Sequence, residues 1–190
     1  QGAADEIMAV LEDNVGAYAG PAWWPDPDTR LAGPTAKVLV ATVVAGEDHG
    51  DFGGRDLRAE TLALVRNEPG DAEHGRIKDH IVGYPTSDDS NTFSQSLAVI
   101  GLARTGGVPE EVVDFLLQQQ CSEGYFRMFA NDRATNPALT CDGGKAADMS
   151  GADTDGTAMA LQALMSARDH GVGGLDDEIT RGLDYLVGAQ

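Results

Sequence analysis

Basic residues are scarce in this sequence, and their scarcity argues against two classes of partner. The 190 residues include 13 Lys and Arg against 31 Asp and Glu, so the formal net charge is −18. Nucleic acids and anionic membrane surfaces are bound by Lys and Arg side chains that replace their counterions. We therefore expect no nucleic-acid partner, and the ordinary consequence of the charge is solubility.

Long apolar runs and a leader are missing as well. No stretch approaches the roughly 20 apolar residues that a membrane-spanning helix needs. The chain opens at Gln1 without a signal-like segment, so we expect that its start is processed and that any export signal has been removed. With 42% hydrophobic residues, the length suits one domain, residues 1–190, with a core of its own.

Only two cysteines are present, Cys121 and Cys141. They form no Cys-x-x-Cys pair and no Cys/His cluster with zinc spacing, so we expect neither a metal site nor a cofactor. Both lie in a segment rich in Gly, Ser and Asp, where a disulfide would limit the unfolded chain by roughly 3 kcal/mol. We expect that disulfide and, with it, an extracytoplasmic location, secreted or at the cell surface. The alternative is a pair of free thiols in a cytosolic protein.

No stretch alternates as a β-strand, whereas apolar residues recur at helical spacing along most of the chain. The sequence therefore predicts an all-α protein with long connections at 18–33, 68–90 and 121–152 that are rich in Gly, Pro, Asp and Ser. The expected helices lie near 4–18, 34–46, 55–67, 91–105, 109–120, 153–169 and 176–189.

These helices are of two kinds. One kind is small-residue, nearly uncharged and apolar all round, which is typical of a buried helix; it covers 35–46, 91–103 and 155–167. The other kind is amphipathic and acidic; it covers 4–15, 55–65, 109–120 and 176–187. The two kinds alternate, and the buried ones start about sixty residues apart. An inner ring of helices wrapped by an outer ring fits this order, as does an irregular helical bundle.

Two segments, 115–126 and 181–190, follow one pattern of aromatic, aliphatic, Gln and Gly residues. The first supplies Phe115, Leu116, Gln120, Gly124 and Phe126, and the second supplies Arg181, Gly182, Tyr185, Leu186 and Gln190. The pattern resembles the glutamine-and-tryptophan repeat of the terpene cyclase and protein prenyltransferase superfamily, the squalene-cyclase type, with Phe126 where Trp is usual. The resemblance implies a partial α/α toroid of stacked helical hairpins.

The repeat residues have a physical role. A Gln at the end of an outer helix can bond backbone groups of the turn and of the next helix, while the Gly lets the chain reverse. The second copy stops at Gln190, so we expect the ring to continue past residue 190 and to be completed by the rest of its own chain or by a second copy. The chain also resembles exported actinobacterial prenyltransferase or squalene-oxidase repeat proteins, and this resemblance implies export. It rests on Gln119, Gln120, Cys121, Gly124, Phe126, Arg127, Cys141, Asp153 and Asp155.

Two carboxylates precede the predicted helix 153–169. The segment Asp153-Thr154-Asp155-Gly156-Thr157-Ala158 is similar to the Asp-x-Asp-Asp-Thr-Ala motif of class II terpene cyclases. That resemblance implies Asp155 as the general acid, with Asp153 and Thr157 supporting it. However, Gly156 replaces the neighbouring carboxyl that helps to tune such an acid, and Phe93 is the only aromatic residue on the inner helices. We therefore favour the alternative, in which a carboxylate caps the helix.

Three functional hypotheses follow. The first is an exported, non-catalytic α/α-toroid module, a scaffold or binding domain with room for a small apolar ligand. The second is a terpene-cyclase-like enzyme that uses Asp155. The third is a carrier of small molecules at the N-termini of the inner helices, because Asp155 and Met159-Ala160 resemble a run in cobalamin carriers that share the toroid.

Overall fold

The computed structural model describes residues 2–20, 26–130, 134, 136–143 and 151–190. Within these ranges the regular structure is helical and contains no strand, so the predicted all-α class is confirmed. The helices are α1 (Gly2–Asp13), α2 (Val15–Ala19), α3 (Ala32–Ala45), α4 (Leu57–Ala63), α5 (Thr92–Arg104), α6 (Glu110–Gln118), α7 (Thr154–Asp169) and α8 (Asp176–Gly188), with a short 3₁₀ helix η1 (Cys141–Gly143).

The two largest departures from the predicted helix boundaries each have a local cause. The expected helix 4–18 is interrupted at Asn14, whose side-chain amide donates to the carbonyl oxygen of Val10 at 2.8 Å and whose backbone leaves the helical region. Helix α4 ends at Ala63 because the following residues pair with a later segment, where the N–H of Lys78 donates to the carbonyl of Leu64 at 3.0 Å.

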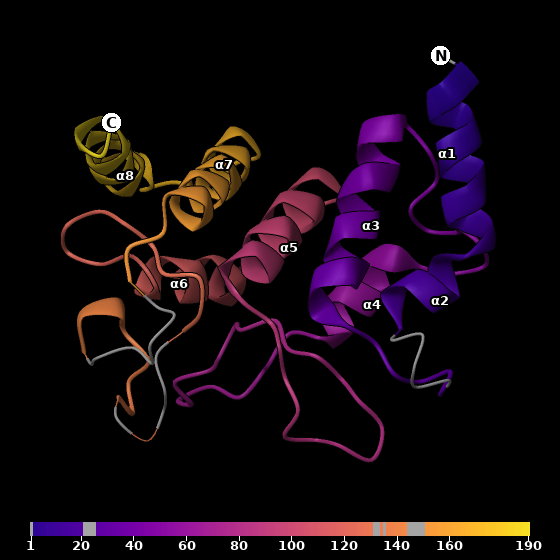
Figure 1. Cartoon of the computed structure of the whole chain (residues 1–190), viewed down its shortest axis with the longest axis horizontal. Helices are drawn as coiled ribbons and strands as arrows, with labels where there is room; N and C mark the ends of the chain where they lie inside the picture. The colour runs from indigo at the N-terminus through magenta and orange to yellow at the C-terminus, as the bar shows by residue number, and fades with distance from the viewer. Residues whose placement is uncertain (1, 21–25, 131–133, 135, 144–150) are drawn as a thin grey trace.

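Helices α3, α5 and α7 lie side by side across the middle of the molecule (Figure 1). Neighbouring helices of this row run parallel. Pro34, Phe93 and Met159, near the three starts, line one hollow, and Arg104 near the end of α5 contacts Ser166 near the end of α7 at 3.5 Å. A Cβ at Gly33 would lie 2.9 Å from the Ser94 hydroxyl near the two starts, and a Cβ at Gly101 would lie 2.8 Å from Leu39 further along. Glycine at 101 thus lets α3 and α5 approach closely.

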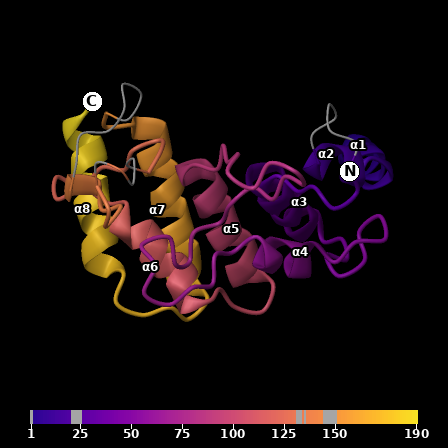
Figure 2. The same ribbon diagram turned by 90° about the horizontal axis from the view of Figure 1, so that it is seen from below.

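The amphipathic helices pack around this central row. We call α3, α5 and α7 the inner helices and α4, α6 and α8 the outer helices. Helix α4 contacts α3 and α5, α6 contacts α5 and α7, and α8 packs on α7 at one end of the row while α1 and α2 contact α3 at the other (Figures 1 and 2). The largest apolar cluster joins α5, α6, α7 and α8 and encloses fully buried Leu116, Phe126 and Leu164. Each such side chain contributes about 1.5–3 kcal/mol to folding.

The connection 64–91 and the described part of the connection 119–153 are crosslinked internally in different ways. In the first, Glu73 pairs with Arg76 at 2.7 Å and with Lys78 at 3.0 Å, and Arg76 also pairs with Asp88 at 2.9 Å. In the second, a disulfide joins Cys121 and Cys141, as the sequence predicts.

None of the helices in the described ranges is long and apolar enough to cross a membrane.

Candidate functional site

Asp153 and Thr157, two of the three candidate catalytic residues, are engaged in structural hydrogen bonds. Asp153 is the N-cap of α7, and its Oδ1 accepts from the backbone N–H of Gly156. The hydroxyl of Thr157 donates to the carbonyl of Asp153 at 2.6 Å and accepts from the backbone N–H of Phe126 at 2.9 Å. These bonds fasten the start of α7 to the preceding loop.

Asp155 lies apart from these bonds. It is exposed in the first turn of α7 and makes no hydrogen bond or ion pair within the part of the chain that the structure describes. Gly156 fits beneath the cap, since a Cβ there would lie 3.1 Å from Oδ1 of Asp153. The structure therefore places the three candidate residues within one turn but does not bring their side chains to a common point.

Gln120 and Gly124 join two neighbouring hairpins. The side-chain amide of Gln120 donates to the carbonyl oxygens of Gly124 at 3.1 Å and of Glu178, on α8, at 2.9 Å. Gly124 has φ +98°, and a Cβ there would lie 2.2 Å from the carbonyl oxygen of Arg181. We call Gln120, Gly124 and Glu178 the second tie.

The other repeat residues pack around the second tie. Phe115 and Phe126 are buried, and Gly182 allows Leu161 to approach α8, since a Cβ there would lie 2.6 Å from that side chain. The ring of Tyr185 lies 5.4 Å from that of Tyr125. Outside the core, Arg181 pairs with Glu178 at 3.1 Å, and Gln190 is exposed at the end of the chain.

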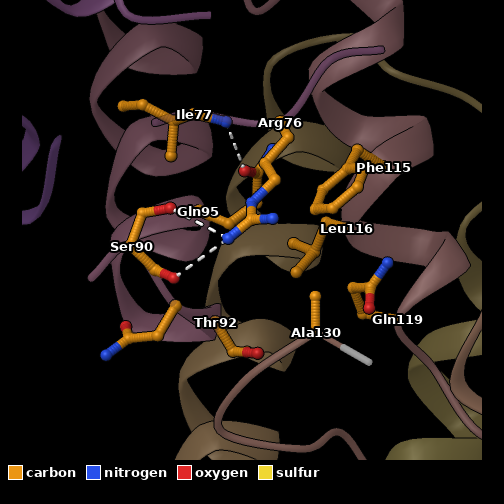
Figure 3. Close-up of a pocket in the computed structure, with 10 residues that line it drawn as sticks. Arg76, Ile77, Ser90, Thr92, Gln95, Phe115, Leu116, Gln119 and Ala130 are labelled. Atoms are coloured by element: carbon orange, nitrogen blue, oxygen red, sulfur yellow. Dashed lines mark hydrogen bonds between the residues drawn. The ribbon is translucent and has the colours of Figure 1, made fainter. Parts of the chain in front are cut away.

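The structure reveals an equivalent arrangement that the sequence analysis missed. The side-chain amide of Gln95 donates to the carbonyl oxygens of Gly75 and of Val112, on α6, both at 2.9 Å. Its Oε1 accepts from the backbone N–H of Ile77 at 2.9 Å, a bond drawn in Figure 3. We call Gln95, Gly75 and Val112 the first tie. As in the second tie, a glutamine bridges a loop glycine and the third residue of the next outer helix.

The glycine of the first tie is also required sterically. Gly75 has φ +83°, and a Cβ there would lie 1.7 Å from the carbonyl oxygen of Glu111. Gly75-Arg76-Ile77 therefore corresponds to Gly124-Tyr125-Phe126, and this Gly-x-apolar spacing was the signal available in the sequence.

Beside the first tie lies a small pocket, shown in Figure 3. Its volume is about 10 Å³, which is room for a single water molecule. Arg76 reaches across it toward Ser90, with contacts of 3.4 and 3.5 Å. The pocket belongs to the packing of the hairpins and is too small for a ligand.

A much larger hollow lies at the N-terminal ends of the inner helices. Its volume is about 740 Å³, within the range of about 300–1,000 Å³ typical of small-molecule sites. Its walls combine apolar side chains from all three inner helices with the loop 79–91. The apolar lining residues are Tyr18, Leu31, Pro34, Ile81, Phe93, Leu97 and Met159, and the polar ones are Lys37, Asp79, Ser87, Asp89, Asn91 and Ser94.

Asp79 ties the loop of this hollow to α3. Its carboxylate accepts from the N–H of Ala32, the first residue of α3, at 2.7 Å and from the N–H of Asp89 at 2.9 Å. Burial raises the pKa of the Asp79 carboxyl above its ordinary value, although the two backbone N–H groups oppose that change. Both oxygens of Asp79 are therefore already engaged by the fold.

A second hollow, of about 660 Å³, shares the lining residues Asp79 and Ile81 and lies between 63–68 and 78–85. Its charged groups are largely paired within the protein, as Arg66 bonds Glu68 at 2.8 Å and Lys78 bonds Glu73 at 3.0 Å. We therefore take the hollow of about 740 Å³ at the N-terminal ends of the inner helices as the candidate ligand site, because it combines apolar walls with few charges.

Among the described residues, no cluster of three or more His, Cys, Asp or Glu side chains has the geometry to hold a metal ion. Comparison with protein-family models, with curated proteins and with solved structures finds no match to this chain. The chemistry of the hollow is therefore inferred from its own geometry.

Proposed function

We propose that this chain is an extracytoplasmic, non-catalytic module of stacked helical hairpins, of the α/α-toroid kind, that binds a small apolar ligand. The observation that carries the proposal is the hollow at the N-termini of α3, α5 and α7, which Phe93, Leu97 and Met159 line from two of these helices. Concave sites with apolar walls and a few polar groups are the usual form of small-molecule sites.

The toroid part of the proposal is supported by repetition. Three parallel inner helices start about sixty residues apart, and each is followed by an outer helix. The first and second ties join successive hairpins by the same pair of hydrogen bonds. Such nearest-neighbour joints are typical of repeat architectures.

The non-catalytic part is supported by the start of α7. Asp153 and Thr157 are engaged in bonds that hold the fold, and the exposed Asp155 has Gly156 where a cyclase-like acid would have a carboxyl neighbour. The cyclase-like alternative lacks a comparable observation. The carrier alternative shares the position of the hollow and Met159 in its lining, but Asp155, on which it also rests, does not line the hollow. The Cys121–Cys141 disulfide favours an oxidising compartment and hence export.

The proposal is tested by titrating the protein with N-phenyl-1-naphthylamine, an uncharged apolar dye whose fluorescence rises in apolar surroundings. We expect saturable binding that falls at least fivefold in Leu97→Glu and in Met159→Glu, because each places a carboxylate in the apolar wall. Leu183→Glu is the matched control, since Leu183 is 44% exposed on α8, away from the hollow.

Circular dichroism melts establish that each variant is folded before its binding is compared. Equal binding by the two hollow variants and the Leu183 control would contradict the proposed site, and absence of saturable binding to the parent protein would contradict the proposed function.

A further inference from the structure

Two of the three inner helices, α3 and α5, differ in charge from the rest of the molecule. Helices α3 and α5 contain no Asp or Glu, although the chain has 31 of them. Their only charged side chains are Lys37 and Arg104. Of these two, Lys37 lines the large hollow.

Lys37 is also singular among the basic residues that the structure describes. It is exposed and makes no hydrogen bond or ion pair with any described residue. The other described Lys and Arg side chains each bond a carboxylate, a carbonyl, a hydroxyl or a sulfur; they are Arg30, Arg55, Arg58, Arg66, Arg76, Lys78, Arg104, Arg127, Arg168 and Arg181. Among the described residues of this acidic chain, the ammonium group without a described acceptor is therefore the one beside the hollow.

From this juxtaposition we propose that the ligand of the hollow is an amphiphile with a single anionic group, such as a medium- or long-chain carboxylate. The carboxylate pairs with Lys37, and the hydrocarbon chain lies along Phe93, Leu97 and Met159. This inference rests on the proposed function, since it assigns the chemistry of the same hollow.

The remaining charges of the hollow set the charge of the ligand. Asp79 and Asp89 line it together with Lys37, and both oxygens of Asp79 already accept backbone N–H groups. The lining offers an anion one cation, Lys37, beside two carboxylates. A ligand with a single negative charge can pair with Lys37 and meets less repulsion from Asp79 and Asp89 than a diphosphate with several charges would. The hollow therefore selects a carboxylate over a diphosphate.

The test compares three ligands with the same ten-carbon chain, each kept below its micelle concentration at pH 8. They are decanoate, decanol and decyltrimethylammonium, and their binding is measured by displacement of N-phenyl-1-naphthylamine. The proteins are the parent chain, Lys37→Met, Lys37→Arg, and Arg104→Met as the control. Arg104 is an exposed cation on α5 that does not line the hollow.

We expect the parent chain to prefer decanoate to decyltrimethylammonium. Lys37→Met should weaken the binding of decanoate about fivefold and leave the binding of decanol unchanged. A partly exposed ion pair contributes up to about a fivefold increase in affinity, and decanol has no charge to pair with Lys37. Lys37→Arg should retain most of the preference, and Arg104→Met should behave as the parent chain.

Two other results overturn the inference. The inference is wrong if Lys37→Met binds decanoate as tightly as the parent chain, or if the parent chain binds decyltrimethylammonium more tightly than decanoate. In either case, binding of decanol would still support the proposed function. If none of the three ligands displaces the dye, or if no dye binds, the proposed function fails together with the inference.

Discussion

The first and second ties perform the same task with glutamines from different places in the chain. Gln120 follows the end of the outer helix α6, whereas Gln95 lies on the inner helix α5. Both donate to a loop glycine and to the third residue of the next outer helix. Both joints between hairpins therefore use a glutamine side-chain amide, and its position in the sequence differs between them.

The two ties also differ in how many of the polar atoms of their glutamine side chains are hydrogen-bonded. Gln95 is buried and uses both its amide nitrogen and its oxygen, since the N–H of Ile77 donates to Oε1. In the second tie the hydroxyl of Thr157 accepts the equivalent N–H of Phe126, and Oε1 of Gln120 has no hydrogen-bond partner among the described residues. The first tie should consequently carry more of the stability.

The largest expected effect comes from the glycines of the ties. Gly75→Ala and Gly124→Ala should each lower the free energy of unfolding by about 3 kcal/mol or more, because the new methyl group would overlap a backbone carbonyl of the next outer helix. Urea unfolding measures the change.

Gly107→Ala is the control for backbone conformation alone. Gly107 also has a positive φ, +106°, but a Cβ there meets no atom within 4 Å, so we expect a loss of only about 1 kcal/mol. Equal losses at 75, 107 and 124 would show that close approach to the helix is not the reason for glycine.

Removal of the disulfide should affect the two long connections differently. Cys121→Ser with Cys141→Ser is expected to lower the free energy of unfolding by about 3 kcal/mol, since the crosslink constrains the unfolded chain. By hydrogen exchange, the amides of 119–130 and 136–143 should lose protection while those of 64–91 keep it, because ion pairs hold the latter. Loss of protection in both connections would contradict this division.

Replacing the two glutamines compares the ties directly. Gln95→Met should cost about 2–3 kcal/mol, because it leaves one N–H and two carbonyl groups without their partner, and Gln120→Met should cost about 1 kcal/mol. Thermal and urea unfolding of the two variants and of their double mutant measure the loss of unfolding free energy at each tie. A larger loss at 120 than at 95 would reverse the proposed order of the ties.

The smallest effect is expected at the start of α7. Asp153→Ala should destabilise the protein by about 1 kcal/mol through loss of the N-cap, whereas Asp155→Ala should change stability by no more than about 0.5 kcal/mol. Urea unfolding distinguishes them. If Asp155→Ala were clearly stabilising, Asp155 would have the character of a strained functional residue, and catalysis would have to be considered again.

Much of the helical framework could be predicted from the sequence, because the periodicity of buried and amphipathic segments is local information. The break at Asn14 was missed, since a single Asn side chain bonding back to Val10 outweighed a continuous helical pattern. The disulfide was predictable because Cys121 and Cys141 are the only cysteines and lie in one loop-like segment.

The first tie and the role of Lys37 could not be predicted in this way. The repeat pattern places its glutamine at the end of an outer helix, so Gln95, within an inner helix, did not match it. Lys37 stands out only because the other described basic side chains each have a hydrogen-bond partner in the folded structure. A sequence does not show which basic side chain lacks such a partner.

The most direct test of the central claim, that the hollow at the inner-helix N-termini is the ligand site, is an NMR titration of the ¹⁵N-labelled protein with N-phenyl-1-naphthylamine. We predict that the largest amide shifts occur at Gly33, Phe93, Leu97 and Met159, which line the hollow from α3, α5 and α7. Shifts centred instead on 63–68 and 82–85, beside the second hollow, or spread without a centre, would contradict the account.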